Sequence, residues 1–159
     1  MAKVRNHKTF IDDRGSFTPI DLQCGPESVN KWLQANISVN PEKFTFRGMH
    51  YQAFETAQNK YVKVIQGKII DFLYDLETKE VEWYELNDQE AIFVPKTKAH
   101  GFLTLKDDTR VVYKVDKFYS KKNDKGYNIN YKFKKVKISK KKFILLNKDS
   151  NLPFFSEKI

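Results

Sequence analysis

Most of the chain consists of short apolar runs rich in Val, Ile, Phe, Tyr and Thr, in which apolar and polar positions often alternate. Runs of this kind, bounded by Gly, Asn, Asp or Pro, are typical of half-buried β-strands. They predict nine strands: Phe17–Leu22, Gln34–Asn40, Phe44–Gln52, Lys60–Gln66, Lys68–Asp75, Val81–Leu86, Glu90–Val94, His100–Thr104 and Thr109–Phe118. Turn signals separate several of them: Gln66-Gly67, Asn87-Asp88, Lys106–Asp108 and Asn123–Gly126.

Helical periodicity is scarce in this sequence. The clearest signal is a short stretch at Glu27–Leu33, where Ser28 could cap one turn. Many short strands with few helices predict an all-β, antiparallel sandwich or small barrel. We find no internal repeat and no linker, so the 159 residues are expected to form a single domain, 1–159.

Composition narrows the class of protein. A hydrophobic fraction of 40% with 14% aromatic residues excludes an intrinsically disordered chain. Cys24 has no second cysteine to pair with, which fits a reducing compartment. The N-terminus has no apolar run typical of a signal peptide, and no segment is long and apolar enough to span a membrane. A cytoplasmic protein without membrane contact is therefore expected.

The net charge of +9 comes from one segment of the chain. Between Lys114 and Lys148 there are thirteen lysines against Asp116 and Asp124. Such a run could bind nucleic acid, attract an anionic substrate or simply form a solvated surface. Because the lysines of Tyr131–Ile138 alternate with apolar residues, the pattern favours a strand with one wet face, and we expect no nucleic-acid partner.

Two of the three histidines are candidates for chemistry. His50 and His100 fall within predicted strands, whereas His7 lies in a polar N-terminal segment. Each candidate has a cation close by in sequence, Arg47 or Lys98, which would disfavour the protonated imidazole and keep it available as a base if the charges converge in space.

Metal and nucleophilic catalysis have weaker support. A metal-binding small barrel would place a second His two residues after His50, but Gln52 stands there. Cys24 lies in a turn-like segment with no sign of an activated thiol, and no known phosphate-binding loop is present. We therefore expect no metal and no cofactor.

Nine segments, taken in order, resemble the dTDP-4-dehydrorhamnose 3,5-epimerase family. They cover nearly the whole chain: Asp12–Phe17, Gln34–Ser38, Arg47–Gln52, Lys60–Gly67, Phe93–Pro95, Ala99–Phe102, Tyr113–Lys114, Phe118–Ser120 and Asn147–Pro153. Each motif is modest alone, but the series is specific. The resemblance implies a cupin-like jelly roll and epimerisation at C3 and C5 of a nucleotide-linked 4-keto-6-deoxy sugar.

The resemblance also implies roles for individual residues. His50 matches the catalytic base, Asp149 the carboxylate paired with it, Tyr113 the acid on the opposite face of the sugar, and Lys60 the cation near the C4 oxygen. These residue types suit the reaction. A proton next to a ketone can be removed only if the enolate is stabilised, and inversion needs a second group to return a proton from the other side.

Further residues match the family's substrate-binding positions. They are Arg14, Phe17, Gln34, Asn36, Arg47, His100 and Phe118. Arg14 and Arg47 are expected to contact the phosphates, and Phe118 matches the residue that stacks on the nucleobase. The family implies a homodimer whose N-terminal strands cross between subunits, so that Arg14 or Phe17 could reach the neighbour's site.

The sequence departs from the family pattern where the nucleotide is recognised. Pro19 replaces a frequent Glu, Phe118 lacks the hydroxyl of the usual Tyr, and the region between Gly67 and Pro95 is short. A GDP-linked hexose or heptose is therefore an alternative substrate, and epimerisation at C3 or C5 alone would use the same residues. Two alternative functions stay open: a 3,4-ketoisomerase on the same fold, and a non-catalytic module that binds a sugar nucleotide or nucleic acid.

Overall fold

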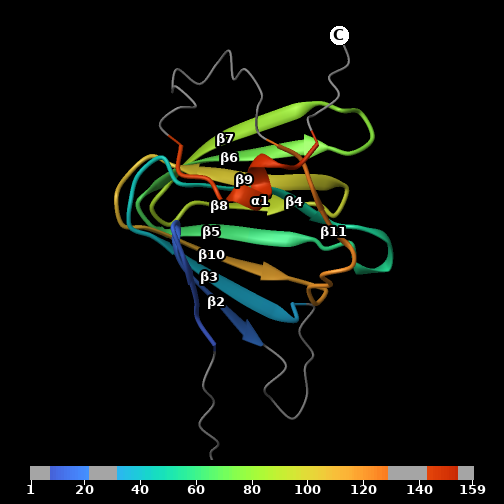
Figure 1. Ribbon diagram of the computed structural model, residues 1–159, viewed down its shortest axis with the longest axis horizontal. Helices are drawn as coiled ribbons and strands as arrows, with labels where there is room; N and C mark the ends of the chain where they lie inside the picture. The colour runs from blue at the N-terminus through green and yellow to red at the C-terminus, as the bar shows by residue number, and fades with distance from the viewer. Residues whose placement is uncertain (1–7, 22–31, 129–142, 154–159) are drawn as a thin grey trace, which may run out of the picture.

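A computed structural model of the chain describes residues 8–21, 32–128 and 143–153 as two antiparallel sheets (Figure 1). The six-stranded sheet has the order β1 (Phe10–Asp12), β2 (Gly15–Asp21), β3 (Gln34–Asn40), β10 (Thr109–Val115), β5 (Lys60–Gln66), β8 (Ala91–Val94). The five-stranded sheet has the order β11 (Asp124–Gly126), β4 (Phe46–Gln52), β9 (Lys98–Thr104), β6 (Lys68–Asp75), β7 (Val81–Asn87). The described helical elements are two short turns, η1 (Phe54–Thr56) and α1 (Asn147–Ser150).

The predicted cupin-like jelly roll is confirmed. Strands that follow one another along the chain repeatedly change sheet, as in the steps from β3 to β4, β5 to β6, β7 to β8 and β9 to β10. The Gln66-Gly67 turn makes one of these steps. Gly67 has a φ of 96°, and a Cβ there would lie 2.4 Å from Thr109 Oγ1, so a residue without a side chain is required.

All nine predicted strands are present, and three of them, β3, β5 and β6, have the predicted bounds. Two short strands were not predicted: β1, and β11, which the sequence had indicated as part of a turn. His7, Cys24, most of Glu27–Leu33 and the lysine-rich part of the chain at 129–142 lie outside the described residues.

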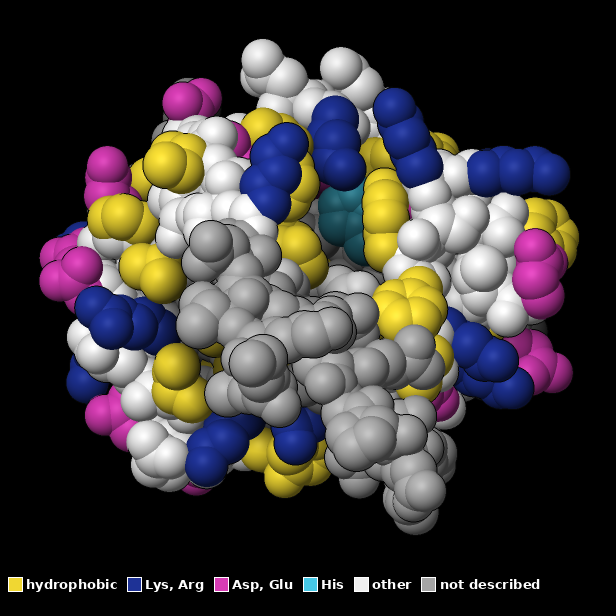
Figure 2. Space-filling model, turned by 90° about the horizontal axis from the view of Figure 1, so that it is seen from below, with side chains coloured by type: hydrophobic (Ala, Val, Ile, Leu, Met, Phe, Trp, Pro, Cys, Tyr) yellow, Lys and Arg dark blue, Asp and Glu magenta, His cyan; other side chains and the backbone are white. Residues whose placement is uncertain are grey.

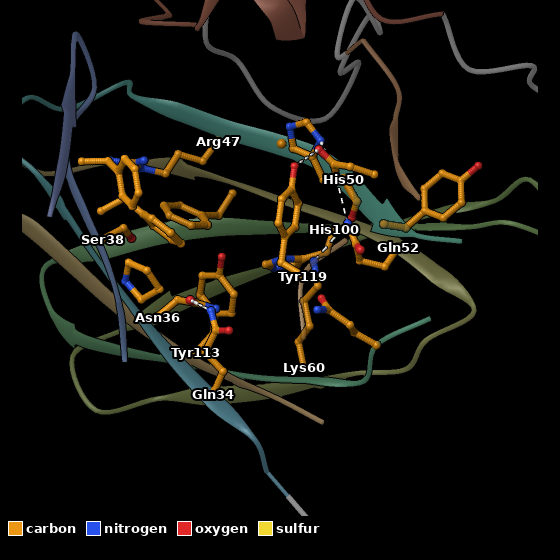
Figure 3. A pocket seen from close by; sticks show the side chains of 18 of the residues that line it. Gln34, Asn36, Ser38, Arg47, His50, Gln52, Lys60, His100, Tyr113 and Tyr119 are labelled. Atoms are coloured by element: carbon orange, nitrogen blue, oxygen red, sulfur yellow. Dashed lines mark hydrogen bonds and ion pairs between the residues drawn. The ribbon is translucent and has the colours of Figure 1, made fainter. Parts of the chain in front are cut away.

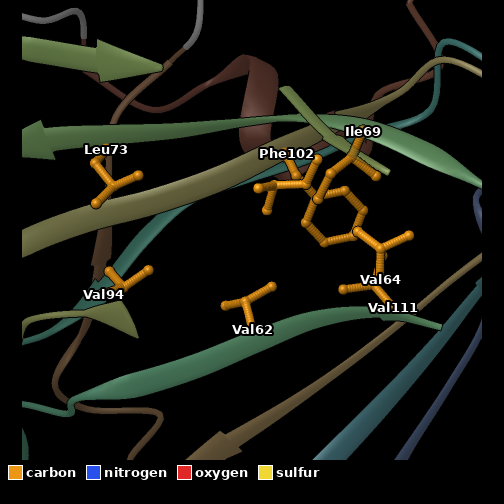
Figure 4. Close-up of a cluster of buried hydrophobic side chains, with 8 residues drawn as sticks. Val62, Val64, Ile69, Leu73, Val94, Phe102 and Val111 are labelled. Atoms are coloured by element: carbon orange, nitrogen blue, oxygen red, sulfur yellow. The ribbon is translucent and has the colours of Figure 1, made fainter. Parts of the chain in front are cut away.

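Two apolar clusters hold the sheets in place. The first fills the space between the sheets and is made of Val62, Val64, Ile69, Leu73, Leu86, Val94, Phe102 and Val111 (Figure 4). Burying an aliphatic or aromatic side chain of this kind contributes about 1.5–3 kcal/mol. Successive side chains of β5 and β10 point to opposite faces of the sheet. Because this cluster already holds the sheet in place, the other inward side chains of these two strands can be polar.

The second cluster covers the other face of the five-stranded sheet. Phe46, Phe72 and Tyr74 form part of it, and Phe143 and Leu145 from the C-terminal segment pack against it. Backbone hydrogen bonds join this segment to the chain near β4: Phe46 N–H donates to the Ile144 carbonyl, and Ile144 N–H donates to Phe44. The segment then enters α1, which carries Asp149 to β4, ninety-nine positions from His50 in the sequence.

Candidate active site

A cavity of about 620 Å³ opens between the two sheets. Side chains from β3, β5 and β10 of one sheet and from β4 and β9 of the other point into it, joined by Tyr119 from the segment after β10 (Figure 3). In the space-filling view a histidine is visible inside a hollow whose rim carries basic and hydrophobic side chains (Figure 2). The cavity therefore combines apolar walls with polar groups that converge from several strands.

Sheet register places two candidate groups on the same face of the six-stranded sheet. Lys60 pairs with Val115, and Tyr113 pairs with Val62 on the same two strands, β5 and β10. Residues two apart on a strand share a face, so Lys60 and Tyr113 are diagonal neighbours and both line the cavity. The alternation that buries Val62 and Val64 between the sheets therefore also delivers Lys60 to the cavity.

Burial changes the acidity of both groups. Removal from water lowers the pKa of the Lys60 ammonium to about 8, and the nearby carboxylates of Asp124 and Asp71 oppose the shift only in part. Burial likewise raises the pKa of Tyr113 to about 12. At neutral pH, Lys60 is therefore mostly charged and Tyr113 carries its phenolic proton.

The two candidate histidines lie directly opposite each other on β4 and β9. Close approach of the two strands depends on glycine: Gly48 has a φ of 126°, and a Cβ there would lie 2.5 Å from Gly101 Cα. This contact explains why a glycine follows Arg47 and another follows His100.

Each histidine is paired with a carboxylate. His50 Nε2 lies 2.9 Å from Asp149 Oδ1, and the Asp149 side chain is only 1% exposed. His100 Nε2 lies 2.8 Å from Asp71 Oδ2, and both residues are buried. A buried carboxylate fixes the orientation of an imidazole and stabilises its protonated form.

These pairs correct the expectation that a cation would stand beside each histidine. The Lys98 ammonium is paired with Glu82 and lies 3.9 Å from Asp75 Oδ2. Arg47 Nε donates to Asn40 Oδ1 at 2.7 Å. Lys98 and His100 share a strand face, but acidic side chains from β6 and β7 neutralise the ammonium.

Arg14 and Arg47 meet at the edge of the cavity formed by the N-terminal hairpin. Arg14 is held by the Asp12 carboxylate and lies 3.5 Å from Asp149 Oδ2, while Arg47 donates to the Ser16 carbonyl at 3.3 Å. Burial lowers the pKa of Arg47 to about 10, with a further lowering by the charge of Arg14. Arg47 therefore stays charged at neutral pH, and the two guanidinium groups together suit an anionic ligand.

The remaining predicted binding residues divide into two groups. Phe17, Gln34, Asn36 and His100 line the cavity, and Gln34 Nε2 donates to Asn36 Oδ1 at 2.6 Å. Phe118 is 43% exposed and is not part of the cavity wall. Its neighbour Tyr119 lines the cavity instead.

Sequence reasoning missed three polar residues of the site: Asp71, Asp124 and Tyr119. Asp71 had a usable signal, because it is the one charged residue inside the apolar run Ile69–Tyr74, and a buried carboxylate requires a partner. The sequence contains no comparable signal for Asp124, because its segment has the composition of a turn. It lines the cavity with Oδ1 3.9 Å from His50 Nδ1.

Two features of the described residues bear on other kinds of function. Within residues 8–21, 32–128 and 143–153, no group of three or more His, Cys, Asp or Glu side chains is placed to hold a metal ion. In the same ranges, no helix has the length and apolar character needed to cross a membrane.

Comparison with known proteins assigns the chain to a family. The family model for dTDP-4-dehydrorhamnose 3,5-epimerase matches residues 2–157. The enzyme of that name from Shigella flexneri is 32% identical over 130 residues, which cover 75% of this chain and 71% of the relative. The corresponding enzyme from Methanothermobacter thermautotrophicus is 36% identical over 137 residues, covering 79% and 72%.

A solved structure of an enzyme with the same name has a similar fold. The dTDP-4-dehydrorhamnose 3,5-epimerase of Bacillus anthracis, with TDP and PPi bound, superposes with a TM-score of 0.72 at 36% identity and covers 93% of this chain and 90% of its own. The class of protein is therefore an isomerase built on a cupin-like jelly roll. The chain belongs to the dTDP-4-dehydrorhamnose 3,5-epimerase family.

Proposed function

We propose that the chain acts, as a single domain in the cytoplasm, on a nucleotide-diphosphate-linked 4-keto-6-deoxy sugar of the dTDP-4-dehydrorhamnose type, and inverts C3, C5 or both without a metal. The observation that carries the proposal is the convergence of His50, with its Asp149 partner, on a cavity that also holds the buried Lys60 and the partly buried Tyr113. The single cysteine is compatible with the compartment.

Proton abstraction from carbon is the difficult step of this reaction. His50 donates one ring N–H to Asp149 and keeps a lone pair on the other ring nitrogen, which accepts the substrate proton. Asp149 then stabilises the imidazolium. The buried Lys60 ammonium stabilises the negative charge that develops on the C4 oxygen.

Inversion requires a proton from the other face of the sugar. Because burial raises the pKa of Tyr113 to about 12, its phenol is protonated and can donate to the enolate carbon. Tyr113 is on the six-stranded sheet and His50 is on the five-stranded sheet, so a sugar bound between them would meet one group on each side.

The rest of the cavity suits the nucleotide part of the substrate. Arg14 and Arg47 supply positive charge for the diphosphate, and Phe17, Gln34 and Asn36 offer apolar and hydrogen-bonding contacts. TDP is bound in the Bacillus anthracis relative, which favours a dTDP-linked substrate here. Tyr119 or Phe118 then stacks on the base, and Tyr119 is the one placed on the cavity wall.

We further propose that the chain forms a homodimer through the outer face of the six-stranded sheet. Tyr61 and Phe93 are opposite each other on β5 and β8, are 43% and 48% exposed, and Trp32 packs 6.4 Å from the Tyr61 ring. Exposed aromatic residues gathered on a sheet face are typical of an interface. In the single chain, Arg14 and Phe17 line the chain's own cavity, and exchange of N-terminal strands would deliver them to the partner.

Product analysis tests the reaction and its alternatives together. The enzyme is incubated in D₂O and EDTA with dTDP-linked and, separately, GDP-linked 4-keto-6-deoxy sugar, and the products are identified by NMR. Deuterium at C3 or C5 together with an inverted centre is the expected result. A 3-keto product would indicate a ketoisomerase, and no conversion of either sugar nucleotide would contradict the proposal.

A further inference from the structure

Each inversion leaves the enzyme in the wrong protonation state for the next one. His50 has gained a proton from carbon, and Tyr113 has lost one to the opposite face. Before another carbon can react, His50 must release its proton and Tyr113 must regain one from water. The site therefore needs a path from the His50 ring to solvent.

Asp149 is badly placed to provide that path. Its side chain is 1% exposed, and its two oxygens face His50 and Arg14 at 2.9 and 3.5 Å. A proton passed to Asp149 would remain enclosed beside the ring from which it came. Asp149 therefore suits an orienting role.

Asp124 stands on the other side of the same ring. Its Oδ1 lies 3.9 Å from His50 Nδ1, a separation that a small side-chain rotation or one bridging water closes. Strand pairing sets this position, because Asp124 pairs with Gln52 and Gly126 pairs with His50 on β11 and β4. Gln52 Nε2 also donates to Asp124 Oδ1 at 3.2 Å, which holds the carboxylate toward the cavity.

The other oxygen of Asp124 leads to the surface. Tyr119, which is 56% exposed, donates its hydroxyl to Oδ2 at 3.2 Å. The Lys148 ammonium, on a side chain that is 58% exposed, lies 3.8 Å from the same oxygen. Asp124 therefore connects a group inside the cavity with two groups in contact with solvent.

The geometry points to Asp124 as the residue that returns His50 to its basic form, a role that rests on the proposed epimerisation. The Nδ1–H bond of the imidazolium breaks and an O–H bond forms on Asp124. The carboxylic acid then releases that proton to water. The proton released balances the one that Tyr113 takes up from water, so no other reactant is needed.

The relay predicts that Asp124→Asn separates the first chemical step from turnover. Wash-out of deuterium from substrate labelled at C3 and C5, with enzyme in excess, measures the first C–H cleavage, and its rate is expected to stay within about threefold of the native rate. Steady-state kcat is expected to fall by about tenfold or more, because the variant has lost a proton-transfer group. Asp124→Glu, which keeps a carboxylate, is expected to restore most of kcat.

A purely structural role for Asp124 would not respond to small buffers. At constant pH and ionic strength, kcat of Asp124→Asn is expected to rise with the concentration of imidazole buffer, while native kcat stays flat. Loss of the first cleavage in parallel with kcat, or a buffer-independent kcat in Asp124→Asn, would overturn the relay. If native enzyme exchanges no deuterium into any 4-keto nucleotide sugar, the proposed function fails first and the relay with it.

Discussion

At the scale of single residues, the site opposes stability. Lys60 is buried, its Nζ donates a long hydrogen bond to the His50 carbonyl at 3.5 Å, and no carboxylate among the described residues lies within ion-pair distance of it. The lowered pKa of Lys60 reflects the free-energy cost of removing its charge from water. The same unmatched charge is what the enolate oxygen would use.

Lys60→Met is therefore expected to stabilise the fold while it abolishes turnover. The folded pKa of about 8 lies below the ordinary 10.5, so the unfolded chain binds this proton more tightly and native stability rises with pH between about 8 and 10.5. At pH 7 the variant should gain up to about 3 kcal/mol in free energy of unfolding, and the rise above pH 8 should flatten. Urea unfolding at pH 7 and pH 10 measures both.

Lys125→Met is the control, because the Lys125 side chain is exposed on β11 and does not line the cavity. Its effect at pH 7 should stay within about 0.5 kcal/mol. A Lys60→Met variant that is less stable than native at pH 7 would contradict the assignment of Lys60 as a buried cation.

The same residue sets the expected alkaline limit of activity. Since kcat/KM reports the free enzyme, it should fall as pH rises through about 8, where Lys60 loses its proton. In Lys60→Arg the guanidinium keeps its charge. The decrease in kcat/KM should therefore occur at higher pH, even if the variant is slower than the native enzyme. Rates of deuterium exchange between pH 6 and 10 provide the profile, and an unchanged limit in Lys60→Arg would assign it to another group.

At the scale of elements, the site depends on how closely β4 approaches β9. Gly48 and Gly101 meet where the strand register shifts between Arg47 and His50. That shift allows both Arg47 and His50 to reach the cavity although they are three positions apart. The chemistry of β4 therefore follows from a glycine contact rather than from regular alternation.

Gly48→Ala should disrupt this arrangement. Its added Cβ meets the backbone of β9 at 2.5 Å in a conformation with positive φ, so we expect a loss of about 2–5 kcal/mol in unfolding free energy. Exchange activity should be lost even where the variant remains folded. Urea unfolding and deuterium exchange check this, and a variant with native stability would show that β9 can move away.

The elements show what sequence could and could not predict. Strands with long apolar runs, such as β6, had correct bounds because burial on both faces selects them strongly. β11 was missed because three residues of turn composition became a strand only by pairing with β4. The pairing of His50 with Asp149 follows from family resemblance, whereas Asp124 depends on a tertiary contact that no local pattern reveals.

At the scale of the whole molecule, basic side chains and exposed aromatic side chains lie in different places. Four Lys and Arg residues line the cavity: Arg14, Arg47, Lys60 and Lys148. Most of the lysine-rich run lies outside the described residues, so its predicted role as a solvated surface stays a prediction. Two exposed aromatic residues, Tyr61 and Phe93, lie opposite each other on the outer face of the six-stranded sheet.

That face is expected to hold two copies of the 18.8 kDa chain together. Sedimentation equilibrium at micromolar concentration should give a dimer, and Tyr61→Lys with Phe93→Lys should shift the mass toward the monomer, because buried like charges oppose association. A native protein that sediments as a monomer would contradict the interface.

The central claim is that His50 removes a proton from carbon next to the ketone, and deuterium exchange in His50→Asn tests it most directly. Native enzyme is expected to incorporate solvent deuterium at C3 or C5 of the 4-keto nucleotide sugar, and the variant to lose about 10²–10⁴-fold of that rate while still binding dTDP and unfolding cooperatively. Exchange at the native rate by a folded His50→Asn variant would show that another group is the base.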